Sequence, residues 1–510
     1  MSQICIVSVM AVYLIMMILI GWRSSGSGNS ASQADFYLGG RKIGPLVTAM
    51  SAEASDMSSY LLMGLPGLAY ISGTCDVGWT VIGLAAGTFL NWLFVSKRLR
   101  RYSEKLGAIT IPDYFSKRFH DERDLLSFIA ALFILIFFIP YTASGFKAIG
   151  TLFNSLFGFD YHISLIVGAA IVIFYTVIGG FLAVSTTDLI QGIVMTFSLF
   201  VIIFFGISQA GGIENVFANA RQLDGYLSMK ATWNITDGTS APYPLLTAVS
   251  TLAWGLGYFG MPHILLRFMA IQDEESLTTS RRIAFIWVVI SMGLSVMIGI
   301  VGLAVSKAGV IPMLMTNTES ETIIIRLANK LAENGIAAAL IAGITLSGIL
   351  ASTMSTADSQ LLQASSSFSK NILQDFFHIR MNNKTAMLCA RITVIVIALF
   401  AVTLAWEPNN SVFRIVSFAW AGFGAAFGPL ILLSLFWKRT NRPGALAGMF
   451  TGGIAVFLWK FLIRPMGGYL DIYELLPAFL LSLLFIIIVS LLTEGPSEEI
   501  LREFTEYRNR

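Results

Sequence analysis

Long apolar runs separated by short polar segments dominate the chain. About thirteen of these runs reach the roughly 20 residues that an α-helix needs to cross the hydrocarbon core of a bilayer. They include residues 4–22, 45–71, 244–271 and 336–365, and the connections between runs are too short to hold a globular domain. The pattern predicts an all-α polytopic membrane protein with about thirteen transmembrane helices.

The second run contains polar residues at a depth where lipid excludes them. Residues 51–60 read Ser-Ala-Glu-Ala-Ser-Asp-Met-Ser-Ser-Tyr, and a helix-breaking Gly-Leu-Pro-Gly follows at 64–67. A carboxylate near the middle of a bilayer costs on the order of 3 kcal/mol, so such residues tend to face a cavity or a partner. Free backbone carbonyls are tolerated there only where protein or water covers them. We therefore expect an unwound helix that offers oxygens to a small cation or a polar solute.

A second interrupted run begins at Trp254, where Trp-Gly-Leu-Gly-Tyr-Phe-Gly-Met-Pro continues to Pro262. Three glycines and a proline this close together weaken an α-helix. The two interrupted runs are five spans apart, which predicts a five-plus-five inverted repeat (LeuT-like) whose halves each begin with a discontinuous helix. The alternative for the second run is that its glycines only allow close helix packing.

Hydroxyl side chains form a stripe along the run at 336–365, beside the carboxylate of Asp358. Four of them recur every seven residues and therefore share one helical face. The alternative is that each hydroxyl bonds back to its own helix. The stripe consists of Thr345, Ser352, Ser359 and Ser366, with Ser355 and Thr356 between them.

Composition agrees with a membrane protein and excludes several classes. Only 12% of the 510 residues are charged, and 55% are hydrophobic. The chain has neither a phosphate-binding G-x-x-x-x-G-K-[ST] motif nor an H-E-x-x-H metal motif. Three cysteines without C-x-x-C spacing make a disulfide framework or a zinc site unlikely. A transporter without a nucleotide-binding motif would take its energy from an ion gradient.

Basic residues gather in alternate connections, including Lys97 to Lys105 and the group of Arg267, Arg281 and Arg282. By the positive-inside rule these connections are cytoplasmic. We therefore expect a multi-pass cell-membrane protein with its N-terminus outside and its C-terminus inside. The predicted segments are 1–44 (first helix and cytoplasmic loop), 45–437 (ten-helix transport core) and 438–510 (two additional helices and a cytoplasmic tail).

Several motifs resemble those of the sodium:solute symporter family, and within it the proline-transporting bacterial members. The resemblance extends from the first span to the last, and no soluble domain interrupts it. Its most specific parts are residues 54–58 with 61–67, 141–145, 181–185, 254–259 with 262–265, 354–356 and 420–429. The resemblance implies sodium-coupled uptake of L-proline by alternating access, with sodium and proline as the partners and without an obligate protein partner or nucleic acid.

The resemblance also implies roles for individual residues. Sodium would bind between the two spans at 45–71 and 336–365, through neutral oxygens of the kind that hard cations prefer. The implied sodium ligands are the carbonyls of Ala54, Met57 and Ser352 and the hydroxyls of Ser355 and Thr356, with Asp56 acting directly or through its charge. Proline would lie near Ser55, Ser58, Tyr141, Trp254, Tyr258, Pro262 and Ser359. Arg41 matches a cytoplasmic gate residue, and Asp188 matches an acid near a second cation position.

Three departures from the family pattern leave alternatives open. Ser59-Tyr60 stands where proline carriers have Gly-Trp, and Glu53 replaces a small residue one turn before Asp56. Asp358 opposite Asp188 would create a further sodium or proton site. The alternatives are a sodium- or proton-coupled symporter of another small amino or carboxylic acid, a membrane sensor, or an intramembrane enzyme that uses Asp188 and Asp358 as acid and base. Packing alone is the alternative role for Trp254 and Tyr258.

Overall fold

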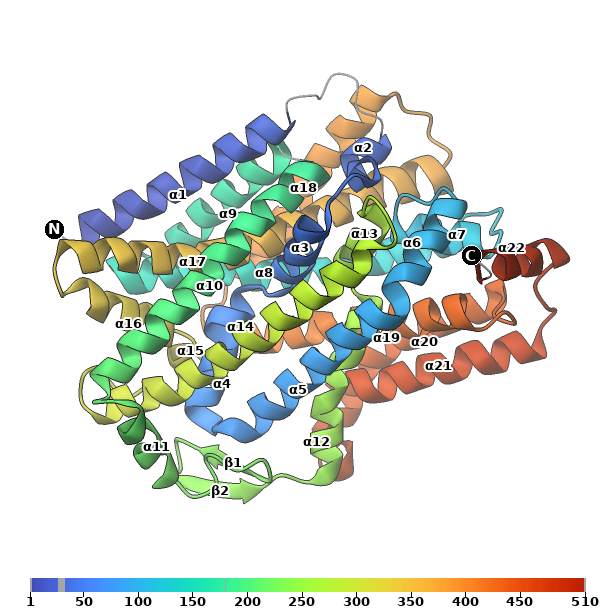
Figure 1. Cartoon of the computed structure of the whole chain (residues 1–510). Coiled ribbons are helices and arrows are strands. Elements are labelled where there is room, and N and C mark those ends of the chain that lie inside the picture. The colour runs from blue at the N-terminus through green and yellow to red at the C-terminus, as the bar shows by residue number, and fades with distance from the viewer. Residues whose placement is uncertain (1, 26–32, 179, 509–510) are drawn as a thin grey trace.

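The computed structural model describes residues 2–25, 33–178 and 180–508, so part of the predicted first segment, 26–32, lies outside it. The described residues are mostly helical, and the long helices run roughly alongside one another (Figure 1). α1 lies at one edge beside α9, α10 and α17, whereas α20 and α21 form the opposite edge (Figure 1). This arrangement confirms a polytopic helical membrane protein.

Ten helical segments in the described ranges are long and apolar enough to cross a membrane. Several of them continue through a π- or 3₁₀-helical turn, such as α5 into η3 (Asn91–Val95) and α17 into η5 (Ser367–Phe376). Their main helices are α1 (Ser2–Ser25), α5 (Thr74–Leu90), α8 (Leu125–Phe157), α10 (Phe181–Gln209), α14 (Ser276–Lys307), α17 (Ile336–Ser366), α18 (Asn383–Leu404), α19 (Val412–Phe436), α20 (Arg442–Leu458) and α21 (Leu475–Leu492).

The three other predicted spans correspond to shorter or interrupted helices. α9 (Tyr161–Ile178) is one of them. The span at 45–71 is divided into α3 (Pro45–Asp56), the π-helical turn η2 (Tyr60–Gly64) and α4 (Leu65–Ser72). The span at 244–271 is divided into α12 (Leu245–Leu252), the 3₁₀-helix η4 (Ala253–Gly260) and α13 (Pro262–Ala270). Both interruptions that the sequence predicts are therefore present.

The interruption between α3 and α4 lies earlier than the Gly-Leu-Pro-Gly sequence. The helix ends at Met57, whose ψ of 63° is not helical, whereas Pro66 lies in the first turn of α4. Proline is well tolerated there because the first N–H groups of a helix have no intrahelical acceptor. The polar Asp-Met-Ser-Ser segment, rather than the proline, is thus the unwound part.

Glycines in η4 also allow close packing. A Cβ atom on Gly255 would lie 2.1 Å from the carbonyl oxygen of Gly83, and one on Gly257 would lie 1.9 Å from Nε1 of Trp420. The packing alternative is therefore confirmed for these glycines, although the helix is interrupted as well. Any larger residue would push η4 away from α5 and α19.

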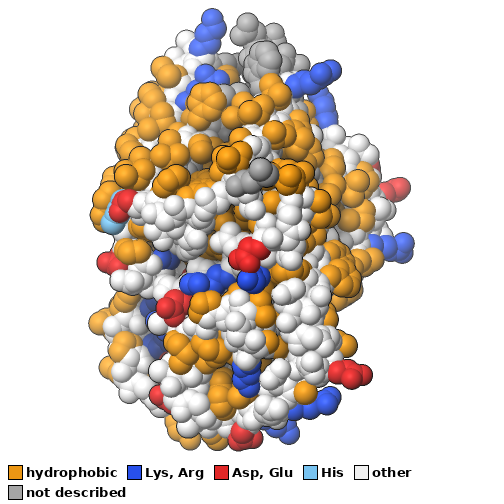
Figure 2. Space-filling view, turned by 90° about the vertical axis from the view of Figure 1, so that its left-hand side faces the viewer, with side chains coloured by type: hydrophobic (Ala, Val, Ile, Leu, Met, Phe, Trp, Pro, Cys, Tyr) orange, Lys and Arg blue, Asp and Glu red, His pale blue; other side chains and the backbone are white. Residues whose placement is uncertain are grey.

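The connections carry short elements at both ends of the helix bundle. One end has α11 (Ile213–Arg221), α15 (Asn317–Ser320), α16 (Ile323–Ala332) and a hairpin of β1 (Ala231–Asn234) and β2 (Thr239–Pro242), paired from Ala231↔Pro242 to Asn234↔Thr239. The other end has α2 (Gln33–Leu38), η1 (Gly39–Arg41), α6 (Ser96–Lys105), α7 (Ile111–Arg118) and α22 (Glu498–Arg508). Hydrophobic side chains cover much of the molecular surface, as Figure 2 shows for one face.

Candidate functional site

The unwound segment after α3 lies at the centre of the molecule, and its side chains are buried. Asp56, Met57 and Ser59 are each 0% exposed. The backbone N–H of Ser58 bonds to the carbonyl of Asp56, and the N–H of Leu61 bonds to the carbonyl of Ser58. The turn thus satisfies part of its own backbone, as buried polar groups require.

Two tyrosines from different helices hold Asp56. The hydroxyl of Tyr258 donates to Oδ2 of Asp56 at 2.6 Å, and that of Tyr141 donates to the Asp56 backbone carbonyl at 3.2 Å. Oδ1 of Asp56 is buried without a hydrogen-bond partner. An unpaired carboxylate oxygen at this depth makes the site attractive to a cation or to a donor group.

The oxygens implied as sodium ligands meet between α3 and α17. The hydroxyl of Ser355 donates to the carbonyl of Ala54 at 2.8 Å and lies 3.3 Å from the carbonyl of Ser352. The hydroxyl of Thr356 is buried and has no partner. This set fits a sodium ion, since its oxygens are neutral and one of them is unsatisfied.

Most other hydroxyls of the α17 stripe bond back to their own helix, as the alternative interpretation predicted. Thr345 donates to Ile341, Ser352 to Ile349 and Ser366 to Gln363. The hydroxyls that depart from this pattern are those of Ser355, Thr356 and Ser359, which lie at the level of the unwound segment. The middle members of the stripe therefore indicate the candidate site better than the stripe as a whole does.

A buried ion pair lies one helical turn or more from the sodium-site oxygens. Nη2 of Arg267 contacts Oδ2 of Asp188 at 2.9 Å and donates to the hydroxyl of Ser359 at 2.6 Å. Ser51 completes the network by donating to Asp188 at 2.6 Å and accepting from Nε of Arg267 at 2.7 Å. Arg267 and Asp188 are 1% and 0% exposed, so the guanidinium neutralises the acid inside the protein.

This ion pair corrects the placement of Arg267. The residue is not part of a cytoplasmic connection, as the charge pattern suggested, because it lies within α13 and is almost completely buried. The signal that could have found it is its position among Leu265, Leu266, Phe268 and Met269, since a cation within an apolar helix marks a functional site.

Asp358 lies close to this network but has weaker partners. Its Oδ1 accepts from the hydroxyl of Ser359 at 3.4 Å, and its Oδ2 is buried without a partner. The side chain is 0% exposed. Oδ1 of Asp188 is likewise buried without a partner, so the difference between the two acids is that Asp188 has an arginine opposite its Oδ2, whereas Asp358 has no ion pair among the described residues.

Glu53 points away from Asp56 and toward α5 and η3. Its Oε1 accepts from Nε1 of Trp92 at 2.8 Å and from the hydroxyl of Thr88 at 3.1 Å. Its Oε2 is buried without a partner. The glutamate side chain consequently anchors α3 to α5 and η3, whereas its backbone carbonyl accepts from the N–H of Met57 at 2.8 Å.

The residues implied for the substrate fall into two groups: those at the unwound segment, and those whose contacts lie elsewhere. Tyr141, Tyr258 and Ser58 surround the unwound segment, where the Ser58 hydroxyl accepts from the N–H of Tyr60 at 3.4 Å. Ser55 instead donates to the carbonyl of Ala52 in its own helix. Pro262 begins α13 and is buried. The Ser359 hydroxyl accepts from Arg267, as described above.

Trp254 packs against aromatic rings of residues that the motifs do not include. Its ring stacks on Tyr473 with a centroid distance of 5.0 Å and lies 5.2 Å from Phe413. Tyr258 meets Trp420 edge-on at 5.0 Å. The packing role is therefore present for both residues, and Tyr473 and Phe413 are ring partners that the motifs did not indicate.

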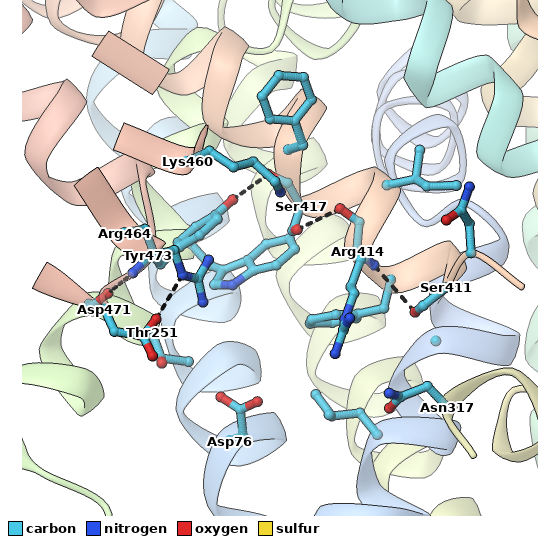
Figure 3. Close-up of a pocket in the computed structure, with 18 of the residues that line it drawn as sticks. Asp76, Thr251, Asn317, Ser411, Arg414, Ser417, Lys460, Arg464, Asp471 and Tyr473 are labelled. Carbon is cyan, nitrogen blue, oxygen red and sulfur yellow. Dashed lines mark hydrogen bonds and ion pairs between the residues drawn. The ribbon is translucent and has the colours of Figure 1, made fainter. Parts of the chain in front are cut away.

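A cavity of about 1200 Å³ opens from Trp254 toward the end of the bundle that carries the β-hairpin. Charged and polar side chains from several helices line it, as Figure 3 shows. Arg464 bonds to Asp471 at 2.9 Å and to Glu474 at 2.9 Å, which ties η7 (Arg464–Met466) to the segment before α21 at the rim. The cavity gives a polar solute a route to the aromatic cluster.

At the opposite end of the bundle, Arg41 joins neighbouring elements. Its guanidinium donates to the carbonyls of Met269 at 2.5 Å and Ala108 at 2.8 Å, and to the hydroxyl of Ser103 at 3.3 Å. Burial and the neighbouring Arg100 lower the pKa of Arg41 to about 10, so it remains a cation at neutral pH. These bonds connect η1 with α6, with the connection after α6 and with α13.

Solved structures show the same fold at low sequence identity. A structure titled as the substrate-bound outward-open state of a Na⁺-coupled sialic acid symporter has a TM-score of 0.77, with 20% identity, and covers 97% of this chain and 99% of its own. Mhp1, a nucleobase-cation-symport-1 family transporter, has a TM-score of 0.57 and 15% identity, and covers 94% of this chain and 99% of its own. At these identities the likeness concerns the fold alone.

Curated relatives are much closer in sequence. The high-affinity proline transporter PutP of Bacillus subtilis is 42% identical over 496 residues, which cover 97% of this chain and 99% of the relative. The sodium/proline symporter of Haemophilus influenzae is 43% identical over 494 residues, which cover 97% and 95%.

The family model agrees with these relatives and excludes the enzyme alternative, because the family and the relatives are transporters. The model described as "Sodium:solute symporter family" matches residues 36–452, which include both interrupted helices and α17. The chain belongs to the sodium:solute symporter family.

Proposed function

We propose that this protein takes up L-proline by sodium-coupled secondary active transport with alternating access. The observation that carries the proposal is the meeting of unsatisfied and neutral oxygens where α3 unwinds beside α17: the Ala54 carbonyl, the Ser355 hydroxyl and the unpartnered Thr356 hydroxyl. The names of the two bacterial relatives, a proline transporter and a sodium/proline symporter, support the choice of substrate.

The sodium ion would be held by Ala54, Met57, Ser352, Ser355 and Thr356, with Asp56 nearby. All but Asp56 offer neutral oxygens, which suit an ion that must also be released. In this assignment Ser355 gives up its bond to Ala54, and both oxygens turn to sodium. The ion would then tie the unwound segment to α17.

L-Proline would bind beside the ion, between Tyr141, Tyr258 and Trp254. Their aromatic rings offer an apolar surface to the pyrrolidine ring. The backbone groups of the unwound segment and of η4 offer donors and acceptors to the zwitterion, with Ser55, Ser58 and Pro262 lining the same region. Binding requires Tyr258 or Trp254 to move, because both rings are packed against α19 or α21.

We further propose the finer architecture predicted from the sequence. Thirteen spans cross the plasma membrane, with the N-terminus outside and the C-terminus in the cytoplasm. Residues 1–44 precede a ten-helix inverted-repeat core at 45–437, and 438–510 follow it. The positions of the two interrupted helices at the start of each predicted repeat support this division.

In this orientation the 1200 Å³ cavity faces outward and Arg41 closes the cytoplasmic end. Alternating access would require the bonds of Arg41 to Met269 and Ala108 to break as the cavity closes. The carbonyl acceptors leave no buried carboxylate unpaired when the arginine leaves. Arg41 is therefore suited to a gate that must open reversibly.

We assign one sodium to each proline, because Arg267 already neutralises the acid at the second cation position. One inward charge at 100 mV provides about 2.3 kcal/mol, and a tenfold sodium gradient provides about 1.4 kcal/mol. Together they support about 500-fold accumulation of a neutral zwitterion. A second candidate is cotransport of a further sodium or a proton at Asp358, which its unpartnered Oδ2 favours.

The proposal is tested in proteoliposomes with a panel of labelled amino and carboxylic acids, with and without an imposed sodium gradient. We expect concentrative uptake of L-proline that requires sodium, and a raised sodium requirement in the variant with Ser355→Ala and Thr356→Ala. Ser365→Ala with Ser366→Ala is the matched control, since both hydroxyls bond back to α17. Uptake that needs no sodium, or that ignores proline, would overturn the proposal.

A further inference from the structure

A small cavity lies at the end of the span that contains α5, away from the transport site. Its volume is about 230 Å³, and it is lined by residues of η3, α6, the connection after α13 and the last turn of α22. Lys97, Arg98 and Arg101 contribute three cations, and Glu274 contributes one carboxylate. The cavity therefore carries a net positive charge.

Arg101 is already satisfied. Its guanidinium bonds to both carboxylate oxygens of Glu274, at 2.9 and 2.5 Å, and to the backbone carbonyl of Tyr507 at 3.2 Å. This fork joins α6, the loop before α14 and α22 into one wall. Both oxygens of the Glu274 carboxylate bond to Arg101, so this carboxylate is not available to neutralise Lys97 and Arg98.

Lys97 and Arg98 have no acidic partner in the part of the chain that the structure describes. No carboxylate lies within ion-pair distance of either of them, and Arg98 instead lies over the ring of Phe436 at 4.1 Å. The ring fixes the guanidinium but leaves its N–H groups without a charged acceptor. Two neighbouring half-buried cations are thus left to bind an anion.

The rim of this cavity on the membrane side is apolar. Leu93 and Phe94 precede the two cations by about one helical turn, and their side chains are 37% and 47% exposed. Residues 77–95 of the helical span Thr74–Lys105 carry no charge and Lys97 is the first cation after them, so the rim lies where lipid tails give way to headgroups. A free inorganic anion would make no favourable contact with these apolar side chains.

We infer that the cavity binds the headgroup of an anionic phospholipid, with the phosphate between Lys97 and Arg98 and the acyl chains along Leu93 and Phe94. Basic pockets at the cytoplasmic ends of membrane helices recognise such headgroups. In the orientation proposed above, the cavity faces the cytoplasmic leaflet, whose anionic lipids attract basic groups. The bound lipid would also contact the Arg101 wall that holds α22.

The test is native mass spectrometry of the full chain in detergent, titrated with phosphatidylglycerol or phosphatidylcholine. We expect one phosphatidylglycerol per chain to bind in preference to phosphatidylcholine. Replacing both cations, Lys97→Gln with Arg98→Gln, should weaken that binding about thirty-fold, since each cation strengthens attachment to anionic lipid about fivefold. The charge-preserving pair Lys97→Arg with Arg98→Lys should keep it within about threefold.

Arg380→Gln with Lys384→Gln is the matched control, because it removes two exposed cations from the first turn of α18 and the connection before it. It should leave phosphatidylglycerol binding unchanged. Equal binding of the two lipids, an equal loss in the control, or complete displacement of phosphatidylglycerol by millimolar inorganic phosphate would each overturn the inference. The last outcome would assign the cavity to a free phosphate ion.

Discussion

Asp56 is the residue on which the proposed sodium site depends most, and a hydrogen bond from Tyr258 orients its carboxylate. Among the described residues, the Tyr258 hydroxyl is the only hydrogen-bond donor to this carboxylate, at 2.6 Å from Oδ2. Hydrogen bonds to a charged group contribute about 1.5–3 kcal/mol. Losing the donor would leave both carboxylate oxygens free to turn away from the unwound segment.

We therefore expect Tyr258→Phe to raise the sodium concentration for half-maximal proline uptake by about tenfold, the equivalent of 1.4 kcal/mol. Uptake measured against sodium concentration in proteoliposomes checks this. Tyr473→Phe is a control of the same chemistry, since its hydroxyl donates to the carbonyl of Ser417 rather than to Asp56, and the variant keeps the ring that stacks on Trp254. Wild-type sodium dependence in Tyr258→Phe would contradict the role.

At this scale the sequence identified acceptors better than donors. Asp56 and the hydroxyls of Ser355 and Thr356 stand out because polar groups within an apolar run are unusual. Arg267 was not predicted to be buried, because the positive-inside rule assigns a cation near the end of an apolar run to a loop. Only the packing of the helices shows that this end of the run is buried. Its pairing with Asp188 joins residues 79 positions apart, which no local pattern reports.

At the scale of elements, the pair of Arg267 and Asp188 joins α13 to α10 and, through Ser51, to α3. Removing one partner of a buried pair leaves an uncompensated charge and typically costs about 3–5 kcal/mol. Removing both partners avoids that charge. The pair should therefore show strong energetic coupling.

We expect Asp188→Asn and Arg267→Gln each to lower thermal stability in detergent strongly, and the double variant to be more stable than the sum of the two effects predicts. Unfolding curves of all four proteins measure the coupling. The exposed pair of Lys330 and Glu333 is the control, whose coupling should be under about 1 kcal/mol. Additive effects of Asp188→Asn and Arg267→Gln would show that the contact does not hold the helices together.

A second link between elements is Glu321, which lies outside the apolar spans and caps α19. Its carboxylate accepts from the Ser411 hydroxyl at 2.6 Å and from the N–H groups of Val412 and Phe413 at 3.2 and 3.3 Å. Burial raises the pKa of Glu321 above its ordinary 4.5 in spite of these bonds. The folded protein therefore holds a proton on Glu321 more tightly than the unfolded chain does.

Since stability falls with pH wherever the folded state binds more protons, the stability advantage of wild type over Glu321→Gln should shrink as pH rises above 4.5. Glu319 provides the opposite sign, because a bond from the Met315 N–H lowers the pKa of Glu319 below 4.5. The advantage of wild type over Glu319→Gln should instead shrink as pH falls below that value. Thermal unfolding across pH measures both, and equal slopes would contradict the assignment.

The interrupted helices show what the sequence can and cannot locate. Glycine and proline density predicted where α12 and α13 separate, because these residues weaken a helix wherever they occur. The same reasoning misplaced the interruption between α3 and α4, since Pro66 is accommodated in the first turn of α4. Whether a proline breaks a helix or begins one depends on the turn before it, and here Asp56 to Ser59 makes that turn.

At the scale of the whole molecule, the lengths of the apolar runs predicted a polytopic helical membrane protein and the positions of its helices. The ten long helices and the three shorter ones fall at the predicted runs, because span length is set by the bilayer. The cavity beside Trp254, the hydrogen bonds of Arg41 and the docking of α22 were beyond prediction. Each depends on contacts between segments far apart in sequence, such as Arg41 with Met269 and Tyr507 with Leu435.

The charge that crosses the membrane with each proline follows from how the protein neutralises its own buried acids. Asp188 is paired with Arg267, so only the sodium beside Asp56 should move, and wild type should carry one positive charge per proline. Paired measurements of current and labelled proline flux in proteoliposomes give this ratio, and the accumulation plateau should approach 500-fold at 100 mV and a tenfold sodium gradient. Asp358→Asn should show the same ratio of one. A wild-type ratio of two that falls to one in Asp358→Asn would instead assign a second transported cation to the unpartnered oxygen of Asp358, and the plateau would then exceed 500-fold by more than a hundredfold, since each further charge and gradient multiplies the ceiling by about 500.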